Sequence, residues 1–353
     1  MKKMFGFSNK KGNYAYTTTR AKAKKSLLLK EEDYNKMLQM STAEIARFIS
    51  DSGYSKEMID LGSKIEGMDL VERATYRHMA DSFKTLLNGS QGELHTLLAA
   101  YLEKWDNWNI KVILRGKSYG LSADDIRDDL VPAGNLSSEE LERLIGMESL
   151  DEIIAAYCKD ESITIPAEIM TQYKADGNLG QIEDYLDKFR YTRLIKIVSA
   201  DTVASRMFLD YIRRDIDVRN FETIMKLKSE GIYGDKVLEY IIPGGKQIDA
   251  KFAKQLADYE KITDTYPDIT QLDFYESVKD IIDNGGNPLE ASIETRKFQR
   301  EQAKKFSSEY PLSVLPVIDY MISMEIETRN IRTIARGLES GLDKETVKQL
   351  LVI

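Results

Sequence analysis

Three asparagines, each preceded by an acid at three residues and followed by a base at six, are the most regular polar feature of this sequence. The trios are Asp106, Asn109 and Arg115; Asp217, Asn220 and Lys226; and Glu327, Asn330 and Arg336. Such side chains can bind a charged partner, or they can hydrogen-bond backbone within the fold. Because buried polar side chains are normally satisfied inside a protein, we interpret the trios as a structural hydrogen-bond network. The functional alternative is a charged partner-binding surface that includes Arg115 and Arg336.

Helix geometry decides which members of a trio can meet. Residues three apart are neighbours on a helix, so Asp106 can reach Asn109. Arg115 lies nine residues beyond Asp106 and cannot pair with it directly. The spacing of the trio therefore allows an acid–amide contact and excludes a direct pair between the acid and the base.

A second recurring set of acids raises the question of acid–base catalysis. Glu72 and Glu183 lie 37 residues before their asparagines, and Glu290 lies 40 before, which a three-residue insertion explains. Catalytic carboxylates need to converge and to have different pKa values. One glutamate per copy implies separation instead, so we expect these residues near helix N-termini, where the helix dipole favours anions.

Other reactive arrangements are missing from the sequence. The stretch PGGKQID around Gly244 and Lys246 lacks the full spacing of a phosphate-binding loop and follows no strand, so it indicates a turn. With two histidines and one cysteine, Cys158, the chain has no Cys/His zinc cluster and no internal disulfide. We predict no catalytic residue, no metal and no cofactor.

The trios belong to a longer repeat of about 110 residues, since the asparagines at 109, 220 and 330 are almost evenly spaced. A glycine follows each asparagine by eleven residues and should end its helix in the left-handed C′ position. These helix stops are Gly120, Gly231 and Gly341. Upstream, Ser41 with Glu44 and Ser149 with Glu152 form matching capping boxes. The middle copy differs, because Lys226 replaces arginine and Leu227 replaces the glycine found at 116 and 337.

Composition indicates an all-α fold. Helix formers dominate, proline is scarce, and runs rich in Val, Ile and Thr are nearly absent. Apolar residues recur at i, i+3 and i+4 after each asparagine, as at Ile110, Ile113 and Leu114. Three large copies favour closure about a pseudo-threefold axis over an open solenoid. We predict a basic N-terminal segment and helix at 1–33 and helical lobes at 34–145, 146–255 and 256–353, with a central opening as a plausible addition.

Charge is distributed unevenly along the chain. The net charge is −8, which argues against a general nucleic-acid binder. Residues 1–30 nevertheless carry nine Lys or Arg and no acid, so this segment could face lipid headgroups or an acidic partner, or could simply be solvated. We expect no signal peptide and no membrane span, because no long apolar run occurs.

From about residue 12 to its end, the sequence resembles the C subunit of the V/A-type rotary ATPases of archaea and bacteria, which is related to the d subunit of the eukaryotic V-ATPase. Three stretches carry the resemblance: YAYTTTRAKAKKSLLL, DNWNIKVILRGKSYGLS and PLSVLPVIDYMISMEIETRNIRTIARG. Their order, spacing and threefold repetition make it specific. The resemblance implies a funnel of three helical lobes without catalytic activity.

The resemblance also implies partners and a location. Such a protein lies on the cytoplasmic face of the membrane, one copy per complex, and links the central shaft, made of the D and F subunits, to the proteolipid rotor ring. It transmits torque during ATP-coupled proton or sodium-ion transport. The main alternative is a helical protein-binding scaffold unrelated to a rotary motor; an enzyme with a site in the central opening is the second.

Overall fold

The computed structural model describes residues 12–198 and 201–353, and within them the chain forms helices and no strand. The predicted all-α class is therefore confirmed. In the described part of the chain, no helix is both long enough and apolar enough to cross a bilayer. The first four basic residues of the N-terminal segment, at positions 2, 3, 10 and 11, lie outside the residues that the structure describes.

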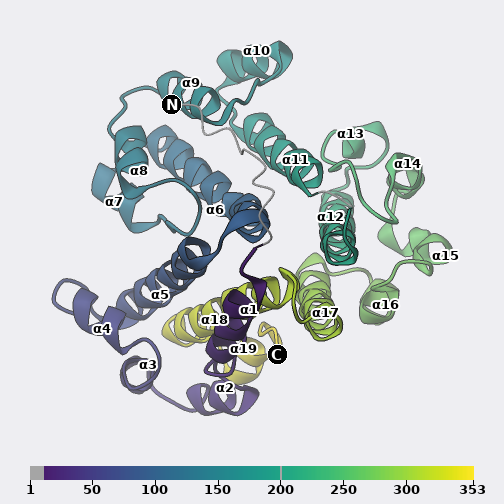
Figure 1. The fold of residues 1–353 in the computed structure, drawn as a ribbon. Helices are drawn as coiled ribbons and strands as arrows, with labels where there is room; N and C mark the ends of the chain where they lie inside the picture. The colour runs from purple at the N-terminus through teal and green to yellow at the C-terminus, as the bar shows by residue number, and fades with distance from the viewer. Residues whose placement is uncertain (1–11, 199–200) are drawn as a thin grey trace. The chain divides into compact units, whose positions relative to one another are not determined.

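The helices are short at the start of the chain and long where the asparagines occur (Figure 1). The first ten are α1 (Tyr14–Lys25), α2 (Glu31–Met37), α3 (Thr42–Ser50), α4 (Ser55–Leu61), α5 (Gly67–Gly89), α6 (Gly92–Ser118), α7 (Ala123–Asp128), α8 (Ser138–Ile145), α9 (Leu150–Glu161) and α10 (Ala167–Asp176). The remainder are α11 (Gly180–Ile197), α12 (Val203–Ser229), α13 (Asp235–Leu238), α14 (Ala250–Asp258), the 3₁₀ helix η1 (Ile262–Thr265), α15 (Tyr266–Ile269), α16 (Tyr275–Asp283), α17 (Pro288–Glu309), α18 (Leu315–Glu339) and α19 (Lys344–Gln349).

The described chain divides into two compact units. The first contains residues 79–197, and the second contains residues 13–78 and 198–353. Helix α5 runs through the division, so the two units share this one helix. The predicted division into three lobes stays a prediction.

In the first unit, α6 is the central helix and packs against α7, α8, α9 and α11. Its predicted apolar stripe, Ile110, Ile113 and Leu114, is fully buried. The stripe is continuous with apolar residues of α8, α9 and α11 in one core. The asparagine helix therefore organises the helices that follow it in the chain.

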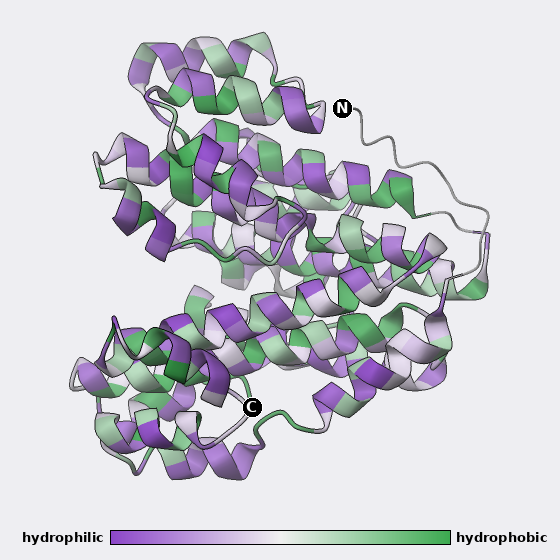
Figure 2. Cartoon of the chain, turned by 60° about the vertical axis from the view of Figure 1, so that its left-hand side comes forward, coloured by the Kyte–Doolittle hydropathy of each residue, from purple (hydrophilic) through white to green (hydrophobic). Residues whose placement is uncertain are grey.

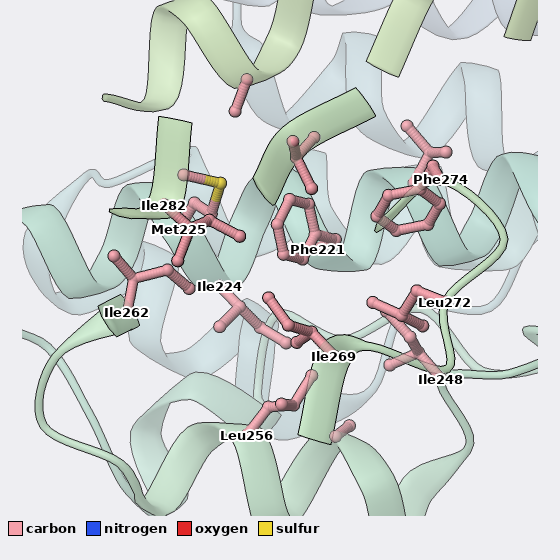
Figure 3. Close-up of a cluster of buried hydrophobic side chains, with 14 of the residues drawn as sticks. Phe221, Ile224, Met225, Ile248, Leu256, Ile262, Ile269, Leu272, Phe274 and Ile282 are labelled. Atoms are coloured by element: carbon pink, nitrogen blue, oxygen red, sulfur yellow. The ribbon is translucent and has the colours of Figure 1, made fainter. Parts of the chain in front are cut away.

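In the second unit, α12 has the same relation to α14, η1 and α17. Figure 3 shows Phe221, Ile224 and Met225 of α12 among Ile248, Leu256 and Phe274 from the following segments. The phenyl rings of Phe221 and Phe274 lie 5.1 Å apart in a tilted arrangement, which adds to the burial of their apolar surface.

The third asparagine helix, α18, packs against both ends of the chain within the second unit. Its neighbours are α17 and α19, and also α1, α2 and α3. Figure 1 shows this as purple α1 and α2 beside yellow α18 and α19. Of the helices that follow α6 and α12 in sequence, the first thus has its counterpart in α19, and the later ones have theirs at the beginning of the chain.

Hydropathy explains why these helices pack on one side. Figure 2 shows hydrophobic and hydrophilic residues alternating along the helices, as expected for elements with one buried stripe. Both predicted capping boxes are present, with the Ser41 hydroxyl accepting from Glu44 N–H and the Ser149 hydroxyl from Glu152 N–H. Local capping thus starts α3 and α9 where the sequence predicts.

Candidate functional site

Each of the three asparagines binds one buried backbone residue through two hydrogen bonds, an arrangement that we call an asparagine clamp. Asn109 Nδ2 donates to Val131 O (2.8 Å) and its Oδ1 accepts from Val131 N (2.8 Å). Asn220 does the same with Ile242 (2.9 and 2.8 Å), and Asn330 with Val352 (2.9 and 3.0 Å). In every copy the partner lies 22 residues later. The clamp satisfies a buried N–H and C=O that no helix pairs.

The first two acids receive N–H groups from the loop that follows the clamp. Asp106 accepts from Asn135 N (2.8 Å) and Leu136 N (2.9 Å), and also from Asn135 Nδ2 (3.2 Å). Asp106 and Asn109, both described, thus bind different stretches of backbone and not each other. The i, i+3 contact that helix spacing allows does not form, because the loop presents donors that would otherwise be buried without partners.

Asp217 repeats this arrangement in the second copy. It accepts from the backbone N–H groups of Lys246 (3.1 Å), Gln247 (2.9 Å) and Ile248 (2.8 Å). The stretch that resembles a phosphate loop is therefore a turn that surrounds the protein's own carboxylate. Lys246 Nζ lies 2.7 Å from Asp210, so its charge is also neutralised within the fold.

Glycine is needed where these loops approach the carboxylates. A Cβ on Gly134 would lie 2.1 Å from Asp106 Oδ1, and one on Gly245 would lie 2.3 Å from Asp217 Oδ1. Both distances are far shorter than any van der Waals contact. The sequence patterns Pro-Ala-Gly and Pro-Gly-Gly thus mark the closest approach of loop and acid.

The third acid, Glu327, is bound by residues from the other end of the chain. It accepts from the backbone N–H of Leu29 and from the hydroxyl of Tyr54. Leu29 immediately precedes the N-cap of α2, just as Leu136 and Ile248 precede the N-caps of α8 and α14. The N-terminal segment therefore supplies to the acid of the third copy what the following loop supplies to the first two.

Burial raises the pKa of all three acids. Desolvation raises the pKa of Asp106 to about 7 against the opposing effect of the Leu136 and Asn135 N–H groups. The pKa of Asp217 is raised for the same reason and is opposed by three N–H groups. Desolvation also raises the pKa of Glu327 to about 7, opposed by Tyr54 and Leu29. The shifts follow from burial in a structural site.

The bases of the trios pair with the second set of acids. Arg115 Nε donates to Glu183 (2.7 Å), which raises the arginine pKa, and Arg336 Nε donates to Glu72 (2.7 Å). Arg336 also binds Asp69 and Glu339. Arg115 and Arg336 keep 60% and 39% of their side-chain surface exposed, so each retains a face for a partner.

The middle copy lacks this pair, since Lys226 forms no ion pair with Glu290 among the described residues. The replacement of arginine by Lys226 and the longer spacing between Glu290 and Asn330 thus affect the same pair of positions. Glu183 and Glu290 lie in the first turn of their helices, as predicted, whereas Glu72 lies beyond the first turn of α5.

The three helix-stop glycines have the same left-handed geometry. Gly120, Gly231 and Gly341 have φ of 71°, 75° and 77°. At the first of them, Gly120 N–H donates to Lys117 O (3.1 Å) and Leu121 N–H to Gly116 O (2.9 Å), which is a Schellman motif. The same two bonds recur after Gly231 and Gly341.

The glycines at 116 and 337 allow a short helix to approach the asparagine helix. A Cβ on Gly116 would lie 2.5 Å from Ile126, and one on Gly337 would lie 2.7 Å from Val347. Leu227 holds this position in the middle copy and is itself buried in one core with Val237. The short helix there, α13, has four residues where α7 and α19 have six.

The geometry of the repeated polar residues indicates a structural role. Within residues 12–198 and 201–353, no group of three or more His, Cys, Asp or Glu side chains is arranged to hold a metal ion. Burial raises the pKa of the single thiol, Cys158, to about 11. The repeated polar residues bind backbone and neighbouring helices, which fixes the segments between them.

Comparison with known proteins identifies the family. The family model for the ATP synthase (C/AC39) subunit matches residues 17–350. The chain belongs to this ATP synthase family. Its resemblance to the C subunit of the V/A-type enzymes is thereby confirmed.

Three relatives show how completely the family similarity covers the chain. The C subunit of the A-type ATP synthase of Methanococcoides burtonii is 36% identical over 98% of this chain and 96% of the relative. The C subunit from Archaeoglobus fulgidus is 34% identical over 97% and 98%, and that from Methanosarcina mazei is 34% identical over 98% and 94%. The chain and these relatives therefore match over nearly their whole lengths.

Proposed function

We propose that this chain is the non-catalytic rotor component that links the central shaft, made of the D and F subunits, to the proteolipid rotor ring. In this role it transmits torque for ATP-coupled proton or sodium-ion transport. The observation that carries the proposal is the near-full-length similarity to the C subunits of A-type ATP synthases. Because the match covers almost all of both chains, the proposed role applies to the whole protein and not to one domain.

The repeated contacts support a mechanical role. Each asparagine clamp holds a buried backbone residue by two hydrogen bonds. Each acid of the trios binds at least one backbone N–H group of the segment that packs over it. Such contacts resist displacement, because breaking one leaves buried polar groups without partners. An element that passes torque between two partners needs connections of this kind.

The proposal includes a shape and a place. We infer three helical lobes, at 34–145, 146–255 and 256–353, around a central opening that receives the shaft. The protein would lie at the cytoplasmic face of the membrane as a peripheral protein, one copy per complex, and would reach the bilayer through the ring. The basic segment at 1–33 would face the ring or the headgroups.

We also propose that Arg115 and Arg336 contribute to the joint with the shaft through their exposed faces. Replacing either by alanine should weaken shaft binding and reduce its salt dependence. Arg127 is a suitable control, because it is a half-exposed arginine of the same kind, paired with Glu142 and Asp124 outside the trios. Arg127→Ala should leave shaft binding unchanged.

The function is tested by capturing the purified chain on two baits, the D–F shaft and the detergent-solubilised ring, over a range of salt concentrations. The proposal expects binding to both at once, with a shaft joint that weakens strongly as ionic strength rises. Binding to neither bait by a folded chain would overturn it and would favour a helical scaffold outside the motor. Deleting residues 2–11 should weaken capture on the ring if the basic segment faces it.

A further inference from the structure

The break between the two ends of the chain falls inside the third copy of the repeat. In the first two copies, the donors to the acid lie 29 to 31 residues after it, on a loop continuous with the clamped residue. In the third copy, the donor Leu29 is separated from Glu327 by 298 residues. The segment that covers Glu327 is therefore not tied to its acid by a short stretch of chain, as the loops over Asp106 and Asp217 are. It can move away from the acid more freely than they can.

The movable part is α1 with its link to α2, residues 13–29, which we call the N-terminal latch. The buried residues of α1 are Thr17, Thr18 and Ala21, so α1 buries little apolar surface. Thr17 Oγ1 is buried without a hydrogen-bond partner among the described residues, which further weakens the contact. The fully buried side chains of α1 are therefore all small.

Polar contacts to α18 hold the latch in place. Lys25 forms an ion pair with Asp319, whose side chain is almost fully buried. Leu29 N–H donates to Glu327, which is also buried. Opening the latch would break both contacts and admit water to Glu327.

Glu327 is the least compensated of the three repeated acids. It has one backbone N–H and one hydroxyl, where Asp217 has three backbone N–H groups. The charged group that acts on it most is another carboxylate, Asp33 of α2, which raises its pKa. The surroundings of Glu327 therefore disfavour the charged form of its carboxyl group.

Other titratable groups surround this contact. They are Tyr34 of α2, Arg300 of α17, the hydroxyl of Tyr54, the pair of Glu57 and His78 (3.2 Å) behind the Tyr54 ring, and Lys24 and Arg20 of α1. Burial and the Arg20 charge lower the pKa of Lys24 from its alkaline value, while Glu57 raises it. Histidine is the side chain whose charge ordinarily changes between pH 5 and pH 8, so His78 is the alternative source of a pH effect at this contact.

We propose that the N-terminal latch closes on α18 with the uptake of a proton by Glu327 and opens as the solution becomes more alkaline. Closure buries Glu327, and a neutral carboxylic acid is buried more easily than a carboxylate.

The direction follows from linkage. With the latch closed, the pKa of Glu327 is raised from its ordinary 4.5 to about 7. Closure is therefore favoured at low pH, weakens as the pH rises from about 4.5 to 7, and stays constant above. If opening restores the ordinary pKa fully, the closing constant falls by about 70-fold between pH 5 and pH 8.

Hydrogen exchange of the full chain tests this. Protection of the α1 amides, corrected for intrinsic exchange rates, should fall between pH 5 and pH 8 by more than about tenfold. Amides of α14, which follows the continuous loop over Asp217 as α2 follows Leu29, serve as the internal reference and should change much less. An α1 ratio equal to that of α14 would overturn the proposal.

Three variants assign the effect to its residue. Glu327→Gln cannot titrate and should make α1 protection independent of pH. Asp217→Asn, the matched change under a continuous loop, should leave the α1 ratio as in the wild type. His78→Gln should also leave most of it, and loss of the ratio in this variant would refute the assignment to Glu327. The His78 variant and the wild type keep the test decisive if Glu327→Gln fails to fold.

Discussion

Replacing Gly134 by alanine should destabilise the first unit strongly, and the structure gives the reason and the size. The added Cβ would lie 2.1 Å from Asp106 Oδ1 and 2.5 Å from its Cγ. The backbone at Gly134 is not in the left-handed region, so the effect is steric and not conformational. Relief requires the carboxylate or the loop to move by about 1 Å, since carbon and oxygen need more than about 3 Å.

Such a movement breaks the bonds from Asn135 N and Leu136 N, which are now 2.8 and 2.9 Å long. Above pH 7, where Asp106 is charged, its hydrogen bonds contribute about 1.5–3 kcal/mol each, and partial entry of water offsets some of the loss. We therefore expect Gly134→Ala to lower the free energy of unfolding by about 3 kcal/mol, a change of about 150-fold in the unfolding constant.

Tryptophan fluorescence during urea unfolding measures this change where it occurs. The only two tryptophans of the chain, Trp105 and Trp108, both lie on α6 in the first unit. With a denaturant slope of about 2 kcal/mol per molar urea, the midpoint should fall by about 1.5 M. Because unit-specific fluorescence is followed, independent unfolding of the second unit does not distort the result.

Gly146→Ala is the matched control in the same unit, because a Cβ there meets only ordinary contacts, 3.4 Å from Glu142 O and 3.6 Å from Arg143 O. It should change stability by less than about 0.5 kcal/mol. In an Asp106→Ala background the clash disappears, so Gly134→Ala should then cost far less. A loss no larger than that of Gly146→Ala, or full additivity with Asp106→Ala, would refute the reasoning.

Three further predictions concern the clamp of Ile242, the carboxyl group of Asp106 and the thiol of Cys158. Asn220→Ala leaves the buried N–H and C=O of Ile242 without partners and should cost about 2–4 kcal/mol by urea unfolding followed by circular dichroism; a loss below about 1 kcal/mol would contradict the clamp. Because burial raises the pKa of Asp106 to about 7, the free energy of unfolding should fall as the pH rises from about 4 to 7 and flatten above, and Asp106→Asn should reduce that slope; an unchanged slope would exclude Asp106 as its source. With a thiol pKa of about 11, Cys158 should react with iodoacetamide at a pH of about 7.5 about 100-fold more slowly in the native than in the unfolded chain, whereas equal rates would mean that the thiol is not buried.

The sequence predicted the all-α class, the helices that carry the three asparagines and the ends of these helices, because these features depend on local chemistry. Apolar spacing, capping boxes and the glycines at 120, 231 and 341 act within one or two turns, and the structure has each at the predicted place. The threefold recurrence carries information that a single motif lacks. In each copy the asparagine binds the backbone of the residue 22 positions later, which three unrelated segments would not share.

Long-range partners were harder to predict. The sequence showed both Arg115 and Glu183 as recurring residues, but a repeat does not say which members of two sets meet across 68 residues. One signal could have paired them, since the base at 226 and the spacing of Glu290, the counterparts of Arg115 and Glu183, both depart from the repeat. Asp106 and Asn109 are neighbours on their helix but bind different backbone groups, because helix spacing determines which side chains can touch and not which buried donors need an acceptor.

The order in which this chain leaves the ribosome makes its third copy unlike the others. A nascent chain grows by roughly 5–20 residues per second, so Asp106 and Asp217 meet their loops within seconds of synthesis. Leu29 is made 298 residues before Glu327 and must wait for roughly 15–60 s. During that interval the first helices have no α18 to pack against. The first unit can thus be complete while the second still awaits its last helix, and newly made chains are most exposed to aggregation and proteolysis at the end that was synthesised first.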